Sequence, residues 1–541
     1  LRRLTHDEYR RTVRDLTGQF VDASLAADQV VEGFRNDAHA LVVNGLLADQ
    51  YRTAAEGVGQ AFDVDAALPC DPSSDGEVAC ATDFVRQFGR RAFRRPLNAG
   101  DVEAYVQLWS DAAQEGFDEG IRWVVTAMLQ SPHFLYRSEL GAREVPGRFV
   151  LTDWEVATAL SYSLWGTMPD DVLFDAADRG ALSSDEDVDA QIERMMADPR
   201  AHDTVGRFVE AWLDLDQLAT VPREGLTPEA REEMAQATRD QVALWVQDGG
   251  TLSTLLLDGE LLVDPTVLTT YARPDGSSPV HRGVLVRERL LCEELPPPPP
   301  NLDTSPPAVD PTQSTRERYS QHADDPACAG CHQLIDPLGF AFEHYDQLGR
   351  WRDDDNGHPI DVTGNVDGMA FEGPDGLAQT LLDDPRVREC FVYTWRRHVR
   401  GTHACGDDLG AEVSLVEPLL EVMRTYGFLN RQGGYGEGDS FAVGGSGNEA
   451  LPPVEAPPGG LRFSIAITSD WGGGYCTRGE VANEGDAAIA WTGRWPVDGS
   501  INNIWDADYV EQGGVWVFSG RNDRATLEPG QGATFGFCAS R

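Results

Sequence analysis

The chain changes character at residues 431–460, RQGGYGEGDSFAVGGSGNEALPPVEAPPGG. This stretch holds nine glycines and four prolines, which is the composition of a linker. After it, short alternating runs such as Phe463 to Thr468 and Val515 to Phe518 indicate strands. Before it, apolar residues recur at helical spacing. We therefore predict a multi-domain protein with a mainly α N-terminal body and a C-terminal all-β antiparallel sandwich.

Helix starts are marked clearly in the N-terminal body. Thr5 with Glu8, and Thr152 with Glu155, fit the capping box, in which two side chains satisfy free backbone N–H groups at the start of a helix. Apolar residues follow both boxes at helical spacing. Two further stretches read as amphipathic helices, Phe84 to Phe93 and Ile121 to Tyr136.

Five consecutive prolines, Pro296 to Pro300, must be extended because proline cannot continue a helix. They separate a long helical part from a shorter part that contains cysteines. The predicted domains are helical domains at 1–145, a helical domain at 146–295, a domain with a C-x-x-C-H motif at 296–430, the linker at 431–460 and the sandwich at 461–541.

The 541-residue chain is strongly acidic, since 44 basic and 89 acidic residues give a net charge of −45. This sign argues against nucleic acid and anionic membranes as partners and suits a neutral polymer. No apolar run is long enough for a membrane helix. The sequence contains no lysine, which excludes Schiff-base chemistry on that side chain.

The nine cysteines include three pairs that lie at positions suited to disulfides: Cys70 with Cys80, Cys390 with Cys405, and Cys476 with Cys538. Disulfides require an oxidising compartment, so we expect a secreted or extracytoplasmic protein. Leu1 does not begin a signal peptide, which predicts a mature or trimmed chain. Cys292, Cys328 and Cys331 need another explanation.

The motif Cys328-Ala-Gly-Cys331-His332 has the C-x-x-C-H spacing used to attach a c-type haem. Two thiols can add to the haem vinyl groups, and the adjacent histidine can bind the iron, which predicts a cytochrome c-like segment in the helical body. Two rival uses stay open. Cys292 could join the motif in a Cys₃His zinc site, or it could form a disulfide with one of the two thiols.

The second axial ligand would decide the chemistry of a haem. Met369 lies in a turn-like GMAFEG stretch and would favour electron transfer, while His344 and His358 are alternatives. An iron left open would favour peroxide or oxygen chemistry.

No G-x-S-x-G elbow, H-E-x-x-H pair or P-loop occurs, and 89 carboxylates are too many to single out a glycosidase pair. A crowded acidic loop is a weaker candidate for calcium, with a solvated loop as the simpler interpretation. Its residues are Asp353, Asp354, Asp355, Asp361 and Asp367.

The C-terminal part resembles the family-2 cellulose-binding modules from Leu461 to Ser540. Its landmarks are SDWGGGYC at 469–476, VANEGDAAIAW at 481–491, INNIWDADY at 501–509 and LEPGQGATFGFC at 527–538. The resemblance implies a small antiparallel sandwich with a disulfide between its terminal cysteines, and a row of exposed aromatic side chains that stack on sugar rings. Trp471 and Trp505 match two positions of that row. Arg521, followed by Asn522, stands at the third, which departs from the family pattern.

The helical body resembles a set of secreted proteins common in planctomycetes and myxobacteria, built from consecutive domains of unknown function. The matching stretches include LRRLTHDEYRRTVRDLTG at 1–18, HRGVLVRERLLCEELPPPPPNLD at 281–303 and CAGCHQLIDPLGFAFEHYDQLGRWR at 328–352. The resemblance implies an extracytoplasmic setting and a link to polymer breakdown or redox chemistry, but no established reaction.

Three functions follow from these observations. The first is a haem redox protein, delivered to cellulose by its binding module and exchanging electrons with a redox partner in polysaccharide oxidation. The second is a glycoside hydrolase whose acids are hidden among many carboxylates. The third is a non-catalytic polysaccharide-binding scaffold with a zinc or disulfide staple.

Overall fold

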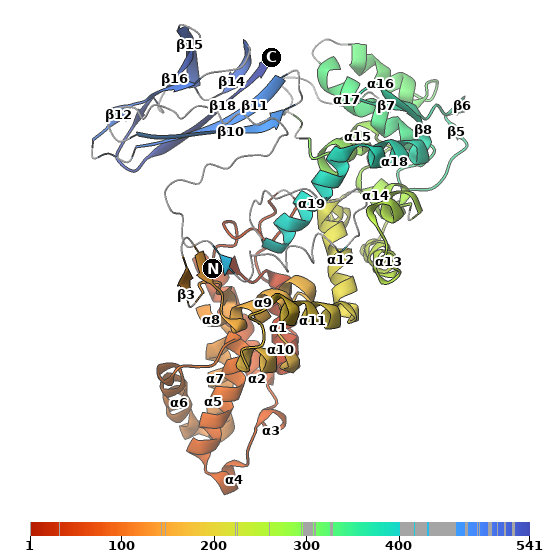
Figure 1. Ribbon diagram of the computed structural model, residues 1–541. Coiled ribbons are helices and arrows are strands. Elements are labelled where there is room, and N and C mark those ends of the chain that lie inside the picture. Colours follow the sequence, from red (N-terminus) through yellow and green to blue (C-terminus); the bar gives the residue numbers. More distant parts are fainter. Residues whose placement is uncertain are drawn as a thin grey trace. The chain divides into compact units, whose positions relative to one another are not determined.

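The computed structural model divides the chain into two compact units, Leu1–Gly433 and Gly434–Arg541. In the first unit the structure describes residues 2–31, 33–141, 143–145, 148–221, 223, 225–258, 260–293, 295, 307, 310–324, 328–400, 416 and 430–431. In the second it describes 461–470, 474–483, 485, 487–495, 500–505, 507–512, 515–521 and 525–540. Helices make up most of the first unit and antiparallel strands the second, as the sequence predicts (Figure 1).

The first unit begins with a helical layer that has its own hydrophobic core. A two-residue strand β1 (Arg2–Arg3) pairs with β2 (Tyr136–Arg137), which brings the two ends of this layer together. Buried aromatic residues such as Tyr9, Phe84 and Phe134 lie at its centre. The helices are α1 (His6–Thr17), α2 (Gly45–Ala61), α3 (Val64–Ala67), α4 (Pro72–Asp75), α5 (Glu77–Phe93), α6 (Ala99–Ala112), η1 (Ala113–Glu115), α7 (Phe117–Leu129) and α8 (Pro132–Leu135).

Both predicted capping boxes are present. The Thr5 side chain accepts from the Glu8 backbone N–H while the Glu8 carboxylate accepts from the Thr5 N–H. Thr152 and Glu155 make the same exchange at the start of α9 (Asp153–Leu164). The helix starts were readable from sequence because capping is local chemistry.

A second core lies in the rest of the first unit. It includes buried residues from before the proline run, such as Leu285 and Leu290, and from after it, such as Leu338 and Phe342. The segments on the two sides of the prolines therefore share one core. The elements are α10 (Asp171–Asp178), α11 (Asp185–Met196), α12 (Pro199–Trp212), η2 (Leu215–Ala219), α13 (Pro228–Gln247), η3 (Thr254–Asp258), η4 (Leu261–Val263), α14 (Pro265–Thr270), α15 (Pro279–Leu285), η5 (Val286–Leu290), α16 (Thr315–Asp324), α17 (Ala329–Gly339), η6 (Phe340–Phe342), α18 (Gly373–Asp383) and α19 (Pro385–Arg400).

Short strands complete this unit. β3 (Arg143–Val145), β4 (Arg148–Val150) and β9 (Asn430–Arg431) form one small antiparallel sheet. β5 (Asp354–Asp355) pairs with β6 (His358–Pro359), and β7 (Thr363–Val366) with β8 (Met369–Glu372). Within the part of the chain that the structure describes, no helix is long and apolar enough to cross a lipid bilayer.

Helices α15 and α17 approach each other very closely, and two glycines allow it. A Cβ atom on Gly339 would lie 1.7 Å from the carbonyl oxygen of Pro279, and one on Gly283 would lie 2.0 Å from that of Ile335. Both obstacles are backbone atoms, which cannot rotate away as a side chain can. The contact therefore requires glycine on both helices, and it fixes α17 beside α15, with β7 packed on α17 as well (Figure 1).

A buried arginine of α15 secures the chain that follows α17. The Arg282 guanidinium, 1% exposed, donates to the carbonyl oxygens of Phe342 at 2.9 Å, Tyr345 at 2.9 Å and Asp346 at 2.8 Å. Burial lowers the pKa of Arg282 to about 10, against the opposing influence of Glu343. Burial likewise raises the pKa of Glu343, which accepts from Arg352 at 2.6 Å. The charges are thus held inside the fold by hydrogen bonds, as buried charges must be.

The second unit is an antiparallel sandwich. One sheet has the order β10 (Leu461–Asp470), β11 (Gly474–Asn483), β18 (Gly532–Ser540), β14 (Ser500–Trp505), and the other has β13 (Thr492–Trp495), β16 (Val515–Gly520), β15 (Ala507–Gln512). β12 (Ile489–Ala490) pairs with β17 (Thr526–Leu527). Phe518 of β16 stacks on Phe537 of β18 with 5.0 Å between ring centroids, so the sheets pack face to face. Trp491, 1% exposed, belongs to this core.

Replacing Gly339 by alanine should destabilise the first unit, because the new methyl group would overlap a backbone carbonyl. We expect a loss of about 3 kcal/mol in the free energy of unfolding, typical of severe overpacking. Gly330→Ala is the matched control, since Gly330 lies in the same helix with no atom within 4 Å of its added Cβ. That variant should gain about 0.5–1 kcal/mol from better helix propensity. Urea melts of both variants test this, and equal stabilities would contradict the proposed close contact.

Candidate functional site

The C-x-x-C-H motif forms the first turn of α17. Cys328 is the N-cap residue, and its carbonyl oxygen accepts from the N–H groups of Cys331 at 3.2 Å and His332 at 3.1 Å. Residues three and four apart in a helix project from the same side. The two sulfurs and the imidazole are therefore gathered on one side of the turn. Both cysteines are free thiols and are half-buried.

The His332 ring is held by Asp336, one helical turn further on. Nδ1 lies 3.0 Å from each carboxylate oxygen of Asp336, whose side chain is 4% exposed. Asp336 was not predicted as a site residue, although its spacing of four residues from the histidine is the spacing of side chains on one side of a helix. With Nδ1 engaged by the carboxylate, Nε2 is the ring atom suited to a metal.

Arg287, a buried residue of η5, contacts the same helix. Its Nε donates to the carbonyl oxygen of Leu334 at 3.1 Å, and its other nitrogens contact Glu293 and Asp367, each at 2.8 Å. Asp367 also accepts from Arg386 at 2.6 Å. Helix α17, the β7–β8 turn and α19 are thus joined by one network of arginines and carboxylates.

The apolar residues behind the motif are not all equivalent. Leu338, Phe340 and Phe342 are buried, whereas Leu334 is 43% exposed. Leu334 therefore lies on the surface of α17 and can offer an apolar face near the motif.

The three candidates for a second axial ligand have different surroundings. Met369 is 46% exposed in β8. The His344 ring stacks on Trp351 with 4.3 Å between centroids, and its Nδ1 lies 2.9 Å from the Arg352 carbonyl oxygen. His358 lies 4.0 Å from Glu317. The identity of the second ligand stays a prediction.

The acidic loop uses its carboxylates for internal hydrogen bonds. Asp353 accepts from the Trp351 indole at 3.1 Å, Asp354 from the Gly357 N–H at 2.8 Å and Asp361 from the Thr363 N–H at 2.9 Å. Asp355 pairs with Arg352 at 2.7 Å, and Asp367 belongs to the network above. Among the described residues no group of three or more His, Cys, Asp and Glu side chains is arranged to hold a metal ion.

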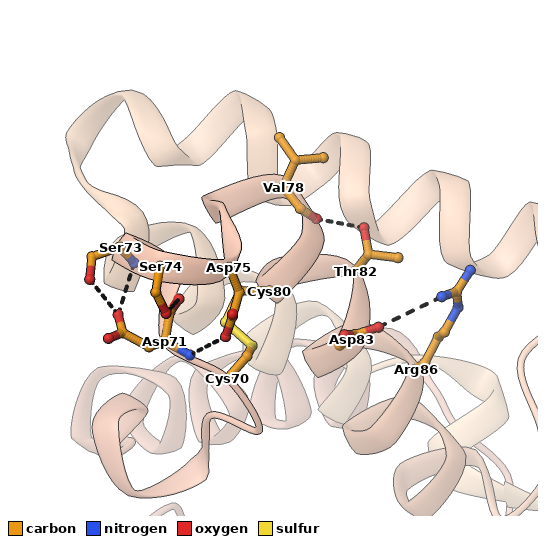
Figure 2. Close-up of a disulfide and its surroundings, with 10 residues drawn as sticks. All are labelled: Cys70, Asp71, Ser73, Ser74, Asp75, Val78, Cys80, Thr82, Asp83 and Arg86. Atoms are coloured by element: carbon orange, nitrogen blue, oxygen red, sulfur yellow. Dashed lines mark hydrogen bonds and ion pairs between the residues drawn. A yellow bond between two sulfur atoms is a disulfide. The ribbon is translucent and has the colours of Figure 1, made fainter.

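Two disulfides are present among the described residues. Cys70 is bonded to Cys80 of α5, as the sequence predicts, and Figure 2 shows the short α4 turn that this bond closes. Asp71 caps that turn by accepting from the Ser73 N–H at 2.9 Å.

The second bond corrects a prediction. Cys390 is bonded to Cys292 and not to Cys405, with a Cα–Cα distance of 5.4 Å across a sequence separation of 98. The packing of η5 against α19 brings the two cysteines together, so a distant residue is nearer in space than the neighbour in sequence. Cys405 lies outside the described residues.

This bond also corrects two alternatives for the C-x-x-C-H motif. Cys292 is not a zinc ligand together with Cys328, Cys331 and His332, because its sulfur is already bonded. For the same reason it does not form a disulfide with either thiol of the motif. The motif keeps two free thiols and a histidine.

The predicted sugar-binding residues of the second unit are only partly described. Trp471 and Asn522 lie outside the described residues. Trp505 ends β14, where its backbone pairs with Gly536. Arg521 is exposed and forms an ion pair with Asp508 at 2.6 Å. The backbone register places Cys476 of β11 opposite Cys538 of β18, and their disulfide stays a prediction.

Comparison with known families divides the chain into matched segments. Residues 2–64, 80–139, 151–272 and 259–355 match four models, each described as a protein of unknown function: PSD3 (DUF1587), PSD5 (DUF1595), PSD4 (DUF1592) and PSCyt3 (DUF1588). Residues 462–541 match the model described as Cellulose binding domain. The PSCyt3 match includes the C-x-x-C-H motif, α15 and the first three aspartates of the acidic loop.

Individual relatives match over short segments. The Major extracellular endoglucanase of Xanthomonas campestris pv. campestris is 34% identical over 76 residues, 14% of this chain and 16% of that protein. Chitinase C of Streptomyces lividans is 34% identical over 80 residues, 14% of this chain and 13% of that protein. The chain thus spans less than a fifth of either relative. The solved chitin-binding domain of Chi18aC from Streptomyces coelicolor shares 31% identity, with a TM-score of 0.14, over 15% of this chain and 79% of that domain. The match to the Cellulose binding domain model supports polysaccharide binding by the second unit.

Non-reducing peptide mapping should recover a linked pair containing Cys292 and Cys390. In the chain-entropy model a loop of this length contributes about 4–5 kcal/mol, so Cys390→Ser should lower stability by up to that amount. Cys405→Ser is the matched control and should leave stability unchanged, because Cys390 already has another partner. A linked peptide joining Cys390 to Cys405 would refute the assignment.

Proposed function

We propose that the protein is an extracytoplasmic redox protein that binds cellulose or a related polysaccharide and carries a covalent haem c on α17. The observation that carries this proposal is the first turn of α17. It presents two free thiols and a histidine whose ring is held by a buried carboxylate. The same chain contains a segment that matches the Cellulose binding domain model.

The residues of this turn fit a covalently attached haem. The four other cysteines whose sulfurs are described are joined in disulfides, whereas Cys328 and Cys331 are not. Their spacing on a helical turn and the histidine directly after them are what attachment of a c-type haem needs. Cys328 and Cys331 would hold the two vinyl groups, and His332 would bind the iron.

Attachment needs no oxidant. Each thiol would add across one vinyl group, with a sulfur–carbon bond at one vinyl carbon and the thiol hydrogen on the other. A haem bound there would supply one-electron transfer between a redox partner and an acceptor. Cys328 and Cys331 would hold the group covalently and His332 would bind it, while Arg287, Gly283 and Gly339 hold α17 in place.

Cellulose is the polymer that suits the second unit best. Crystalline cellulose exposes flat apolar faces of glucose rings, which aromatic side chains cover without needing charge. Trp471 and Trp505 stand at positions of the family's aromatic row. A planar guanidinium at Arg521, oriented by Asp508, replaces the third ring. A chain of net charge −45 is also better suited to a neutral polymer than to an anionic one.

The disulfides favour a location outside the reducing cytoplasm. The endoglucanase and the chitinase give little support to the hydrolase alternative, because the matches cover only 16% and 13% of those proteins. No residue of the described part can be assigned to glycoside hydrolysis from its geometry.

The protein should bind insoluble cellulose with little dependence on salt, because stacking carries the interaction. Trp471→Ala and Trp505→Ala should each weaken binding by about 1–3 kcal/mol, the usual effect of losing a large aromatic anchor. Trp123→Ala is the matched control, since Trp123 is 47% exposed on the helical body. Pull-downs with insoluble cellulose measure binding of all three variants. If Trp471→Ala and Trp505→Ala bind like the parent, the assignment of the binding face is wrong.

Protein made in a host that matures c-type cytochromes should be red. Its intact mass should include one haem, and Cys328→Ala with Cys331→Ala should abolish the covalent addition. His332→Ala should shift or abolish the Soret band, while His358→Ala should leave the covalent addition in place. Zinc near one per chain with no haem mass would overturn the redox proposal and favour a scaffold.

A further inference from the structure

Asp336 is a buried carboxylate placed against the candidate haem ligand. Its side chain is 4% exposed, and both oxygens lie 3.0 Å from Nδ1 of His332. A histidine can donate from Nδ1 only when the proton lies on that nitrogen, so this contact selects the tautomer in which Nε2 carries the lone pair. In that tautomer the lone pair that iron would bind lies on Nε2.

Asp336 is held in place on α17 because residues before it and after it in the chain pack against other elements. Ile335 lies against Gly283, and Gly339 lies against Pro279, at separations that leave no room for a side chain. Leu334 is held through its carbonyl oxygen by Arg287. Residues 334 to 339 are therefore tied to α15 and η5, and Asp336 cannot follow the histidine if the ring rotates.

We propose that Asp336 is a positioning residue that sets both the orientation and the donor strength of His332. This inference rests on the proposed haem at Cys328 and Cys331. A carboxylate that accepts from Nδ1 adds electron density to the imidazole, and a stronger donor stabilises the oxidised, more highly charged iron. Asp336 therefore lowers the reduction potential below the value that a neutral acceptor would give.

The electron balance is simple. One electron from an external reductant converts ferric to ferrous iron, and no bond to the protein forms or breaks. Asp336 changes the equilibrium of that step by favouring the ferric side. It takes no part in covalent attachment, which involves only the two sulfurs and the vinyl groups.

The test is a redox titration of the full chain carrying haem, with dithionite as reductant and ferricyanide as oxidant. Asp336→Asn keeps the size of the side chain and removes its charge. We expect haem attachment to persist by intact mass. The equilibrium constant for reduction should rise at least tenfold, which corresponds to 59 mV for one electron. Asp383→Asn, an exposed aspartate at the end of α18, is the matched control and should not change the potential.

Asp336→Glu retains the carboxylate and is the second variant for the titration, to be used also if the asparagine variant does not fold. Its equilibrium constant should stay within about threefold of the parent, because the charge beside Nδ1 is kept. A tenfold rise in the glutamate variant, or a parent-like potential in the asparagine variant, would overturn the role of Asp336 while the haem proposal stands. Parent protein without haem, from a competent host, would overturn the proposed function itself.

Discussion

The close contact of α15 with α17 is the constraint on which the candidate redox site depends. Gly283 and Gly339 let the two backbones meet where any side chain would overlap a carbonyl group. Once the helices are this close, Arg282 reaches the carbonyl oxygens that follow α17, and Arg287 reaches the one at Leu334. The first turn of α17, with its two thiols and its histidine, is consequently attached to a rigid base although it lies near the surface.

The sequence predicts those features whose causes are local. The capping boxes at Thr5 and Thr152 and the disulfide of Cys70 with Cys80 depend on neighbouring residues. The division into a helical body and an antiparallel sandwich follows from the change of periodicity at the linker.

Contacts between residues far apart in the sequence could not be predicted. The pairing of Cys292 with Cys390 depends on the packing of η5 against α19, which no spacing reveals. The shared core across the proline run has the same origin, because Leu290 and Leu338 belong to one core only in the folded chain. Asp336 could be predicted only in part. Its spacing from His332 was visible, but its burial, which gives the contact its chemical meaning, was not.

The two units contribute different physical interactions to the proposed function. Binding by the sandwich needs flat aromatic surface and no charge, while the α17 site needs thiols, an oriented imidazole and a stable helical base. The measurement that tests the combination most directly is the haem content of protein sedimented with cellulose, after expression in a host competent in haem attachment. The account predicts a red pellet with one haem c per chain. A colourless pellet of intact protein, with Cys328 and Cys331 open to alkylation, would contradict it.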